Sequence, residues 1–189
     1  MKQARVLSHQ ELKRVLTVAA AGKHGQRNCL ALLLSYFTGL RVGEIASLRW
    51  SDLLDDDHTV KAAFYLEATN TKSGEARAVH LNQILRREIA TYLVSCNTTL
   101  VLASPVICSQ KGHAFSANSL CQLFGRLYAA AGITDASSHS GRRWFITQLA
   151  HKGVSSKVIM ELAGHKNLGT TQRYIEVNEE MKKQAVSLL

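Results

Sequence analysis

The sequence predicts a mainly α-helical fold with one small antiparallel β-sheet, an α+β class built as a single domain over residues 1–189. Helices are expected on both sides of the middle of the chain, where apolar residues recur at helical spacing. Many of these segments are bounded by capping residues and glycines. One central stretch alternates apolar and polar residues around a turn, as a β-hairpin does. The chain has no long linker, low-complexity tract or internal repeat, so one domain around one core is the simplest arrangement.

Three helices are expected in the first fifty residues. Ser8 and Glu11 form a capping box, which predicts that a helix begins there. Gly39 is expected to end a second, more buried helix. The three expected ranges are residues 8–21, 26–37 and 42–48, so Arg41 lies at the junction between the second helix and the third.

An acidic loop and a hairpin are expected next. Four aspartates crowd into residues 51–58, which predicts a turn. Residues 60–68 and 76–81 alternate apolar with polar side chains, and this pattern predicts two paired strands. Between them Lys72-Ser73-Gly74 is a turn signal, so we expect Lys72 at or near the tip of the hairpin.

The second half is expected to be helical except for residues 97–115, which contain the only proline. Asn82 should cap a helix that ends near residue 95. The buried stripe expected on that helix is Ile84, Leu85, Ile89, Tyr92 and Leu93. The further helices are expected over residues 116–132, 140–151, 156–163, 170–174 and 178–188.

The charge of the chain favours a polyanionic partner. Lysine and arginine number 23 against 14 aspartates and glutamates, which gives a net charge of +9. A basic excess of this kind suits binding to nucleic acid through phosphate contacts and counterion release. A merely soluble cationic protein explains the charge equally well, so charge alone does not decide between the two.

The cysteines and the N-terminus indicate a reducing cytoplasm. Cys29, Cys96, Cys108 and Cys121 include no Cys-x-x-Cys pair, and three of them lie in apolar helical segments, which favours buried free thiols. The N-terminus has no apolar stretch typical of a signal peptide. The longest apolar run, residues 29–34, is too short to span a bilayer.

Six polar residues have the side chains that a phosphate-transfer site needs. Displacement at a phosphodiester requires cations for two nonbridging oxygens, an aligned nucleophile and a proton for the leaving oxygen. Arginine suits the first task because its planar fork pairs with phosphate through two parallel hydrogen bonds. The candidate residues are Arg41, Lys72, His139, Arg142, His165 and Tyr174.

The other candidates suggest complementary roles. His139 and His165 could donate hydrogen bonds to the developing charge or move a proton. Lys72, on the hairpin, could reach a leaving oxygen as a general acid, and Tyr174 is the candidate nucleophile. Glu44, three residues after Arg41 on the same helix, could orient the guanidinium of Arg41.

Taken singly, each candidate also has an ordinary explanation as a surface, core or turn residue. A zinc site is disfavoured because His139, His151 and His165 lack ligand spacing and a nearby cysteine. The sequence contains no phosphate loop, dinucleotide fingerprint, nucleophile elbow or His-Glu-x-x-His motif. The hypothesis of a phosphate site therefore depends on the order and spacing of the six residues.

In that order and spacing the chain resembles the catalytic domain of the tyrosine recombinases, the phage-integrase family of site-specific DNA recombinases. The resemblance covers nearly the whole chain. It rests on four boxes, which resemble the first arginine box, the hairpin lysine, the His-x-x-Arg box and the closing Gly-His and tyrosine box. They are Thr38-Gly39-Leu40-Arg41-Val42-Gly43-Glu44-Ile45, Thr71-Lys72-Ser73-Gly74, His139-Ser140-Gly141-Arg142-Arg143, and Ala163-Gly164-His165 through Thr171 to Tyr174.

The resemblance implies a recombinase catalytic-domain fold and a DNA strand-transfer reaction. Tyr174 would attack the scissile phosphate and form a 3′-phosphotyrosyl link, while Lys72 would protonate the leaving 5′-oxygen. The two arginines would hold the phosphate, the two histidines would stabilise the transition state, and Glu44 would support Arg41 and His139. No metal or nucleotide cofactor is implied. The implied partners are double-stranded DNA, three further copies in a DNA-bound tetramer, and accessory DNA-bending proteins, with no membrane.

The last helix, about residues 178–188, would dock on a neighbouring subunit in that tetramer. Packing against its own domain is nearly as good an expectation in the absence of DNA. Compared with most members of the family it resembles, the chain is expected to be without the N-terminal core-binding domain. It is expected to be either a naturally short recombinase, like the fimbrial-switch inversion enzymes, or a fragment of a longer integrase.

Two positions depart from the family pattern. Gly141, before Arg142, and Ala163, before Gly164, stand where the family more often has leucine. Neither change removes a functional group, but a glycine inside a helix weakens it by about 1 kcal/mol relative to alanine.

Three other functions fit parts of the same pattern. A relaxing topoisomerase of the eukaryotic-like type resembles this active-site chemistry, but the Gly-His and Thr-x-x-Tyr boxes match recombinases better. A non-catalytic DNA-binding regulator on the same scaffold would be expected to have lost at least one of the six residues. A helical scaffold protein without a site is the remaining alternative.

Overall fold

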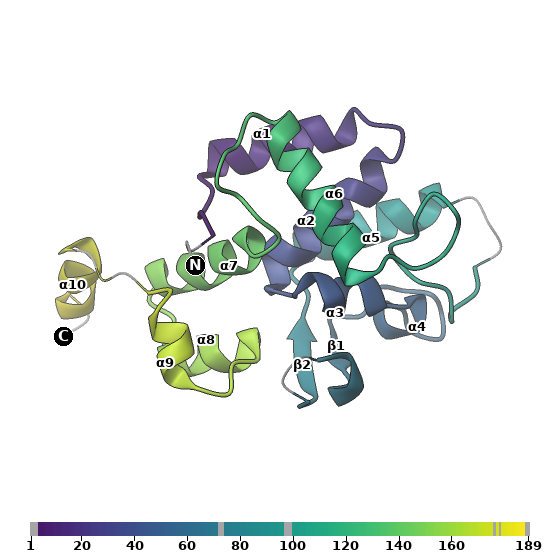
Figure 1. The fold of residues 1–189 in the computed structure, drawn as a ribbon. Coiled ribbons are helices and arrows are strands. Elements are labelled where there is room, and N and C mark those ends of the chain that lie inside the picture. The colour runs from purple at the N-terminus through teal and green to yellow at the C-terminus, as the bar shows by residue number, and fades with distance from the viewer. Residues whose placement is uncertain (1–3, 72–73, 97–99, 176, 178, 188–189) are drawn as a thin grey trace.

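The computed structural model describes residues 4–71, 74–96, 100–175, 177 and 179–187, and it contains the expected mixture of helices and one hairpin (Figure 1). In chain order the elements are α1 (His9–Ala20), α2 (Gly25–Thr38), α3 (Val42–Ser47), α4 (Trp50–Leu53), β1 (Ala63–Leu66), the 3₁₀ turn η1 (Ala68–Asn70), β2 (Arg77–His80), α5 (Gln83–Ser95), α6 (Ala117–Ala130), α7 (Ser140–His151), α8 (Ser156–Ala163), α9 (Leu168–Gln172) and α10 (Glu179–Val186).

The helix ends follow the capping residues that the sequence contains. The Ser8 hydroxyl accepts a hydrogen bond from the Glu11 amide, and the Glu11 carboxylate accepts one from the Ser8 amide, so the expected capping box is confirmed. Asn82 caps α5 through the Leu85 amide. Gly39 ends α2 in the left-handed conformation, with φ 68°, and its position leaves no room for a Cβ because Phe145 packs against it.

The helix α2 forms the centre of the fold. It contacts α1, α3, α5 and α7, and most of its side chains are buried. Figure 1 shows α1 and α6 on one side of α2, with the hairpin and α4 on the opposite side. A second, smaller apolar cluster joins α7 to α8 through Ile146, Ala150, Ile159 and Ala163. This cluster anchors the C-terminal helices beside the main core.

The hairpin is shorter than the sequence predicts. β1 pairs antiparallel with β2 in the register Ala63 to His80 through Leu66 to Arg77. Beyond Leu66 the chain leaves the ladder and forms η1, where the Thr71 hydroxyl donates to the Ala68 carbonyl. The predicted tip residue, Lys72, lies outside the described residues.

Three further expectations need correction. Part of the predicted acidic loop is the short helix α4, because the Asp52 carboxylate accepts the Arg49 amide and caps it. Ile84 is 58% exposed and does not belong to the buried stripe of α5. The four cysteines are free, as expected, but they are half-buried rather than buried.

Gly141 allows α7 to pack closely on α2. A Cβ at this position would lie 2.3 Å from Ser35 Oγ and 2.8 Å from Ser35 Cβ. Because Ser35 is fully buried, it has no room to move away. The structure therefore gives a reason for glycine at this departure from the family pattern: a leucine here would push the two helices apart.

We expect Gly141→Ala to lower the free energy of unfolding by about 1–3 kcal/mol, since the added methyl group overpacks the contact with Ser35. Gly125→Ala is the matched control, because Gly125 lies in α6 with open space where the Cβ would be. That control should gain about 0.5–1 kcal/mol from helix propensity. Urea titration of both variants tests the prediction, and a stabilised Gly141→Ala would contradict it.

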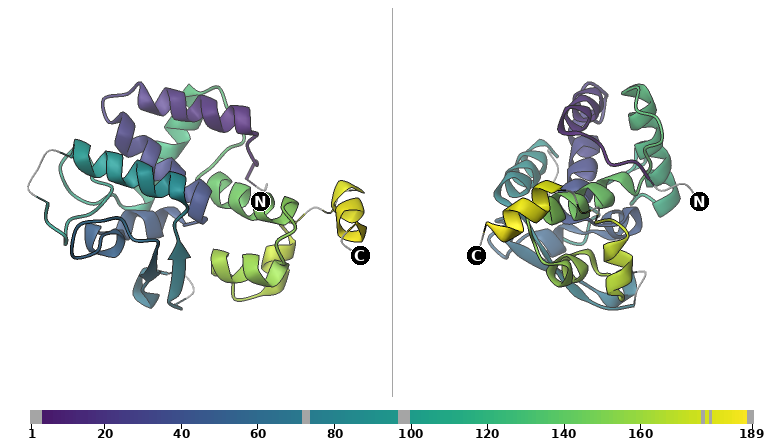
Figure 2. Two further views of the ribbon diagram at one scale, coloured as in Figure 1. Left: turned by 180° about the vertical axis from the view of Figure 1, so that it is seen from behind. Right: turned by 90° about the vertical axis from the view of Figure 1, so that its left-hand side faces the viewer.

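The helix α10 stands apart from the rest of the chain in Figures 1 and 2. Val177 before it is 65% exposed, and Val186 near its end is 70% exposed. Within the described residues, these two valines are therefore not buried against the rest of the domain. Within the described residues, no helix is long and apolar enough to cross a membrane.

Candidate active site

Arg142 ties together three parts of the fold. It lies in the first turn of α7 and is 4% exposed. Its Nη1 donates to the Gly39 carbonyl at 2.7 Å, and its Nη2 donates to the Ala163 carbonyl. The guanidinium thus joins the end of α2 to the end of α8, which are far apart in the sequence.

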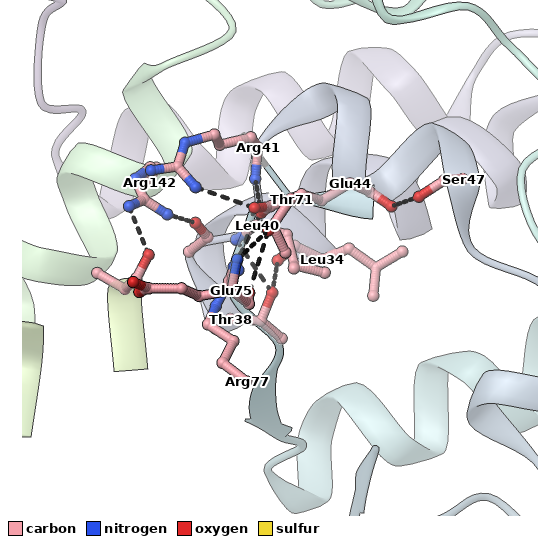
Figure 3. Close-up of polar contacts among 12 residues, drawn as sticks. Leu34, Thr38, Leu40, Arg41, Glu44, Ser47, Thr71, Glu75, Arg77 and Arg142 are labelled. Carbon is pink, nitrogen blue, oxygen red and sulfur yellow. Dashed lines mark hydrogen bonds and ion pairs between the residues drawn. The ribbon is translucent and has the colours of Figure 1, made fainter. Parts of the chain in front are cut away.

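Arg41 approaches the same place from the N-terminus of α3. Its amide and its Nη1 donate to the two oxygens of Glu44, at 2.8 Å and 2.9 Å. Figure 3 shows the side chains of Arg41 and Arg142 converging on one region, and the charge of Arg41 acts on Arg142. The two arginines expected from the sequence to bind phosphate are therefore brought together, although 101 positions separate them.

A third arginine, Arg77, completes this cluster, and it is not among the candidate residues expected from the sequence. Its Nη1 and Nη2 donate to the two Glu44 oxygens at 3.0 Å and 2.9 Å, a bidentate pair (Figure 3). The sequence did contain a signal. Arg77 lies two residues from the buried Val79 on β2 and therefore shares its face of the strand.

Gly164 makes room for Arg77. It ends α8 in the left-handed conformation, with φ 64°. A Cβ at this glycine would lie 2.8 Å from Cδ and 2.9 Å from Nε of Arg77. The glycine in front of His165 is thus required both by the backbone turn and by the close approach of Arg77.

Glu44 is the buried carboxylate that holds two of these arginines, and it is 2% exposed. Burial acts to raise the pKa of the Glu44 carboxyl, but the hydrogen bonds and charges of Arg77 and Arg41 outweigh burial and lower the pKa. Glu44 therefore pairs with two of the three guanidinium groups, while Arg142 donates to backbone carbonyls. An excess of positive charge is left to attract an anion.

We expect Glu44→Gln to lower the unfolding free energy by about 3–5 kcal/mol at pH 7, because it leaves the partly buried Arg41 and Arg77 without their buried counter-charge. The pKa of Glu44 is lower in the folded protein than its ordinary value of 4.5. The ionised carboxylate therefore stabilises the fold fully above pH 4.5, and this stabilisation is lost as the pH falls through the lowered pKa. The difference from wild type should therefore shrink in acid. Urea titrations between pH 7 and pH 3 measure it, with the exposed Glu88→Gln as control. A cost independent of pH would contradict this account.

Burial and positive charge also act on Arg142 and His165. Burial, together with the charge of Arg41, lowers the pKa of the Arg142 guanidinium to about 9, so Arg142 remains charged at neutral pH. His165 is 9% exposed. Burial and the charges of Arg142 and Arg41 lower the pKa of its imidazole to about 4. His165 is therefore neutral at pH 7.

Tyr174 lies against His165. The two rings stack with their centroids 5.8 Å apart and their planes 18° apart. The Arg143 guanidinium lies over the Tyr174 ring at 5.9 Å, a cation–π contact. The sequence predicts Tyr174 inside a helix, but α9 ends at Gln172, so Tyr174 lies in the turn that follows.

His139 shares a hollow with Tyr174. It is the residue that precedes α7, and it lines a cavity of about 280 Å³ with Arg143, Thr170 and Tyr174. His165 and Arg77 line a different cavity, of about 580 Å³, between β2 and α8. The structure thus gathers Arg41, Arg142, His165 and Tyr174 and places His139 beside Tyr174. Lys72 lies outside the described residues.

Comparison with known proteins identifies the family to which the chain is similar. The family model described as "Phage integrase family" matches residues 5–181. "Tyrosine recombinase XerA" of Thermococcus kodakarensis is 30% identical over 96% of this chain and 61% of its own length. "Tyrosine recombinase" of Pseudothermotoga lettingae is 32% identical over 87% of this chain and 54% of its own length. The chain therefore spans less than two thirds of these curated relatives.

Solved structures share the fold. The crystal structure of XerA recombinase superposes with a TM-score of 0.77 at 22% identity, covering 100% of this chain and 64% of that one. The Tn1549 transposon integrase in complex with a circular intermediate DNA gives a TM-score of 0.80 at 19% identity, covering 100% and 67%. At these identities the likeness is one of fold, and it confirms the expected class, mainly α with a small antiparallel sheet.

Proposed function

This chain belongs to the phage integrase family, and from that premise we propose that it is a site-specific DNA recombinase. It cleaves and rejoins DNA strands through a 3′-phosphotyrosyl intermediate, with Arg41, Lys72, His139, Arg142, His165 and Tyr174 as its catalytic residues and Glu44 in support.

One observation carries the proposal more than any other. Tyr174 stacks on a buried, neutral His165, and the charges of Arg142 and Arg41 act on that His165. A candidate nucleophile, a hydrogen-bond donor and an excess of positive charge therefore occur together. These are the groups that displacement at a phosphodiester requires.

In the proposed reaction Arg41 and Arg142 bind the nonbridging oxygens of the scissile phosphate. The Tyr174 hydroxyl gives up its proton to solvent as its oxygen attacks phosphorus, the bond from phosphorus to the 5′-oxygen breaks, and the phosphate becomes linked to Tyr174. Lys72 protonates the leaving 5′-oxygen, while His139 and His165 stabilise the charge of the transition state. A 5′-hydroxyl of the partner strand reverses these steps. The phosphotyrosyl link conserves the bond energy, so no nucleotide or metal cofactor is needed.

The proposed partner is double-stranded DNA, in agreement with the net charge of +9. The Tn1549 transposon integrase and XerH, to which this fold is similar, were solved bound to DNA. The helix α10 is separated from the other elements (Figure 2). This position supports the proposal that α10 docks on a neighbouring copy in a DNA-bound tetramer. The proposal also includes accessory DNA-bending proteins as partners and a cytoplasmic location for a protein that is prokaryotic or phage-encoded.

A pool of nicked DNA duplexes of randomised sequence tests the activity. The nicked strand carries a 5′ label, and the short fragment released by cleavage diffuses away, which traps the covalent product. We expect a labelled protein–DNA adduct that resists SDS and is enriched in particular sequences. Failure to form an adduct with any duplex would contradict the proposal, and DNA binding without an adduct would favour a non-catalytic regulator. Relaxation of a supercoiled plasmid without strand exchange would favour a topoisomerase.

A further inference from the structure

Thr171 contacts both His165 and Tyr174. Its hydroxyl Oγ1 lies 2.8 Å from Nδ1 of His165. Its carbonyl accepts the Tyr174 amide at 3.0 Å. The Thr171 side chain lies in α9 and is fully buried, and His165 is 9% exposed. The hydrogen bond between the Thr171 hydroxyl and His165 Nδ1 is therefore shielded from water.

Burial determines which of the two groups donates the hydrogen. Threonines in helices often donate to the carbonyl four residues earlier, as Thr17 and Thr38 do here. Among the described residues, Thr171 Oγ1 has His165 Nδ1 as its hydrogen-bond partner. If Nδ1 carried a hydrogen and donated it, the hydroxyl hydrogen of Thr171 would be buried without an acceptor, which is costly. The hydroxyl therefore donates, and Nδ1 accepts.

An accepting Nδ1 places the single ring hydrogen on the other nitrogen. His165 is neutral at pH 7 because burial and the guanidinium groups of Arg142, Arg41 and Arg77 lower the pKa of its imidazole. A neutral imidazole carries one hydrogen, and when Nδ1 is the acceptor that hydrogen is on Nε2. The stack on Tyr174 holds the plane of the same ring.

We propose that Thr171 is a positioning residue that fixes His165 in the tautomer with its hydrogen on Nε2, so that His165 offers a constant donor to the scissile phosphate beside Tyr174. The role toward phosphate rests on the proposed recombinase function. Because Thr171 binds His165 through its side chain and Tyr174 through its backbone, it also sets the donor and the nucleophile relative to each other.

The tautomer can be measured in the free wild-type protein by long-range ¹H–¹⁵N correlation of ¹⁵N-histidine at neutral pH. The His165 signals are assigned as those missing from His165→Gln. We expect the ¹⁵N shift of Nε2 to be that of a protonated nitrogen and the shift of Nδ1 that of an unprotonated one. A hydrogen on Nδ1 of the wild-type protein would overturn the proposal, whatever the activity.

Two variants then test whether Thr171 causes this tautomer. Thr171→Val keeps the shape and removes the hydroxyl, and we expect mixed tautomers and a rate of adduct formation on the nicked duplexes about 10- to 100-fold lower. Thr171→Ser keeps the hydroxyl and should restore both the tautomer and most of the rate. A Thr171→Val protein that retains the Nε2 tautomer would overturn the proposal, as would a Thr171→Ser protein as slow as the valine variant.

The two readouts separate this inference from the proposed function. If Thr171→Val fails to fold, the proposal is still tested by the tautomer of His165 in the wild-type protein and by the rate of adduct formation of Thr171→Ser relative to wild type. If the wild-type protein shows the expected tautomer but forms no adduct, the proposed function fails, and with it the role of His165 as a donor to phosphate.

Discussion

Tyr174→Phe is expected to form no adduct that resists SDS, while it binds the same duplexes as tightly as the wild-type protein. The substitution removes only the hydroxyl oxygen, and without that oxygen no bond to phosphorus can form. The remaining ring can keep its stack on His165 and its contact with the Arg143 guanidinium, so the fold around it should persist. Gel analysis in SDS measures the adduct, and a filter-binding titration measures DNA affinity.

Tyr65→Phe is the matched control for this variant. Tyr65 lies on β1 and is 77% exposed, so loss of its hydroxyl should leave both adduct formation and DNA affinity unchanged. An adduct formed by Tyr174→Phe at the wild-type rate would show that another residue attacks the phosphate. A Tyr174→Phe protein that no longer binds DNA would instead give Tyr174 a structural role.

Elements whose ends are marked by local chemistry could be predicted from the sequence. The predicted ranges of α7 and α8 coincide with the observed ones, since Gly153, the Ser155 cap and Gly164 bound them. The ends of β1 and the helix α4 could not be predicted in this way. They depend on the 3₁₀ turn after Leu66 and on Asp52 capping a single helical turn.

The residue types of the candidate site could also be predicted, but not its connections. Glu44 was linked to Arg41 because three positions on one helix bring them together, whereas its bidentate partner Arg77 is 33 positions away. The contact between His165 and Thr171 depends on how α9 folds back after Gly164. Such contacts are set by tertiary packing, and the spacing of residues along the chain does not contain them.

Arg142→Lys keeps the positive charge of the side chain, but it should lower both the stability and the activity of the protein. The two carbonyls of Gly39 and Ala163 each accept a hydrogen bond from a different nitrogen of Arg142. A lysine ammonium has no planar fork, and it cannot take both positions in a site that is 4% exposed. One buried carbonyl would lose its partner, which lowers the unfolding free energy by about 1–3 kcal/mol in urea titration.

The same substitution should slow adduct formation by on the order of 10²- to 10³-fold, the usual effect of losing one preorganised donor to developing charge. Arg126→Lys is the control, because Arg126 is exposed on α6 and should change neither stability nor rate. Rates are compared at a temperature where every variant is fully folded, so that lost stability cannot imitate lost catalysis. If Arg142→Lys kept the wild-type rate while losing stability, Arg142 would only join α2 to α8, and the phosphate would have to be bound by Arg41 and the remaining cations.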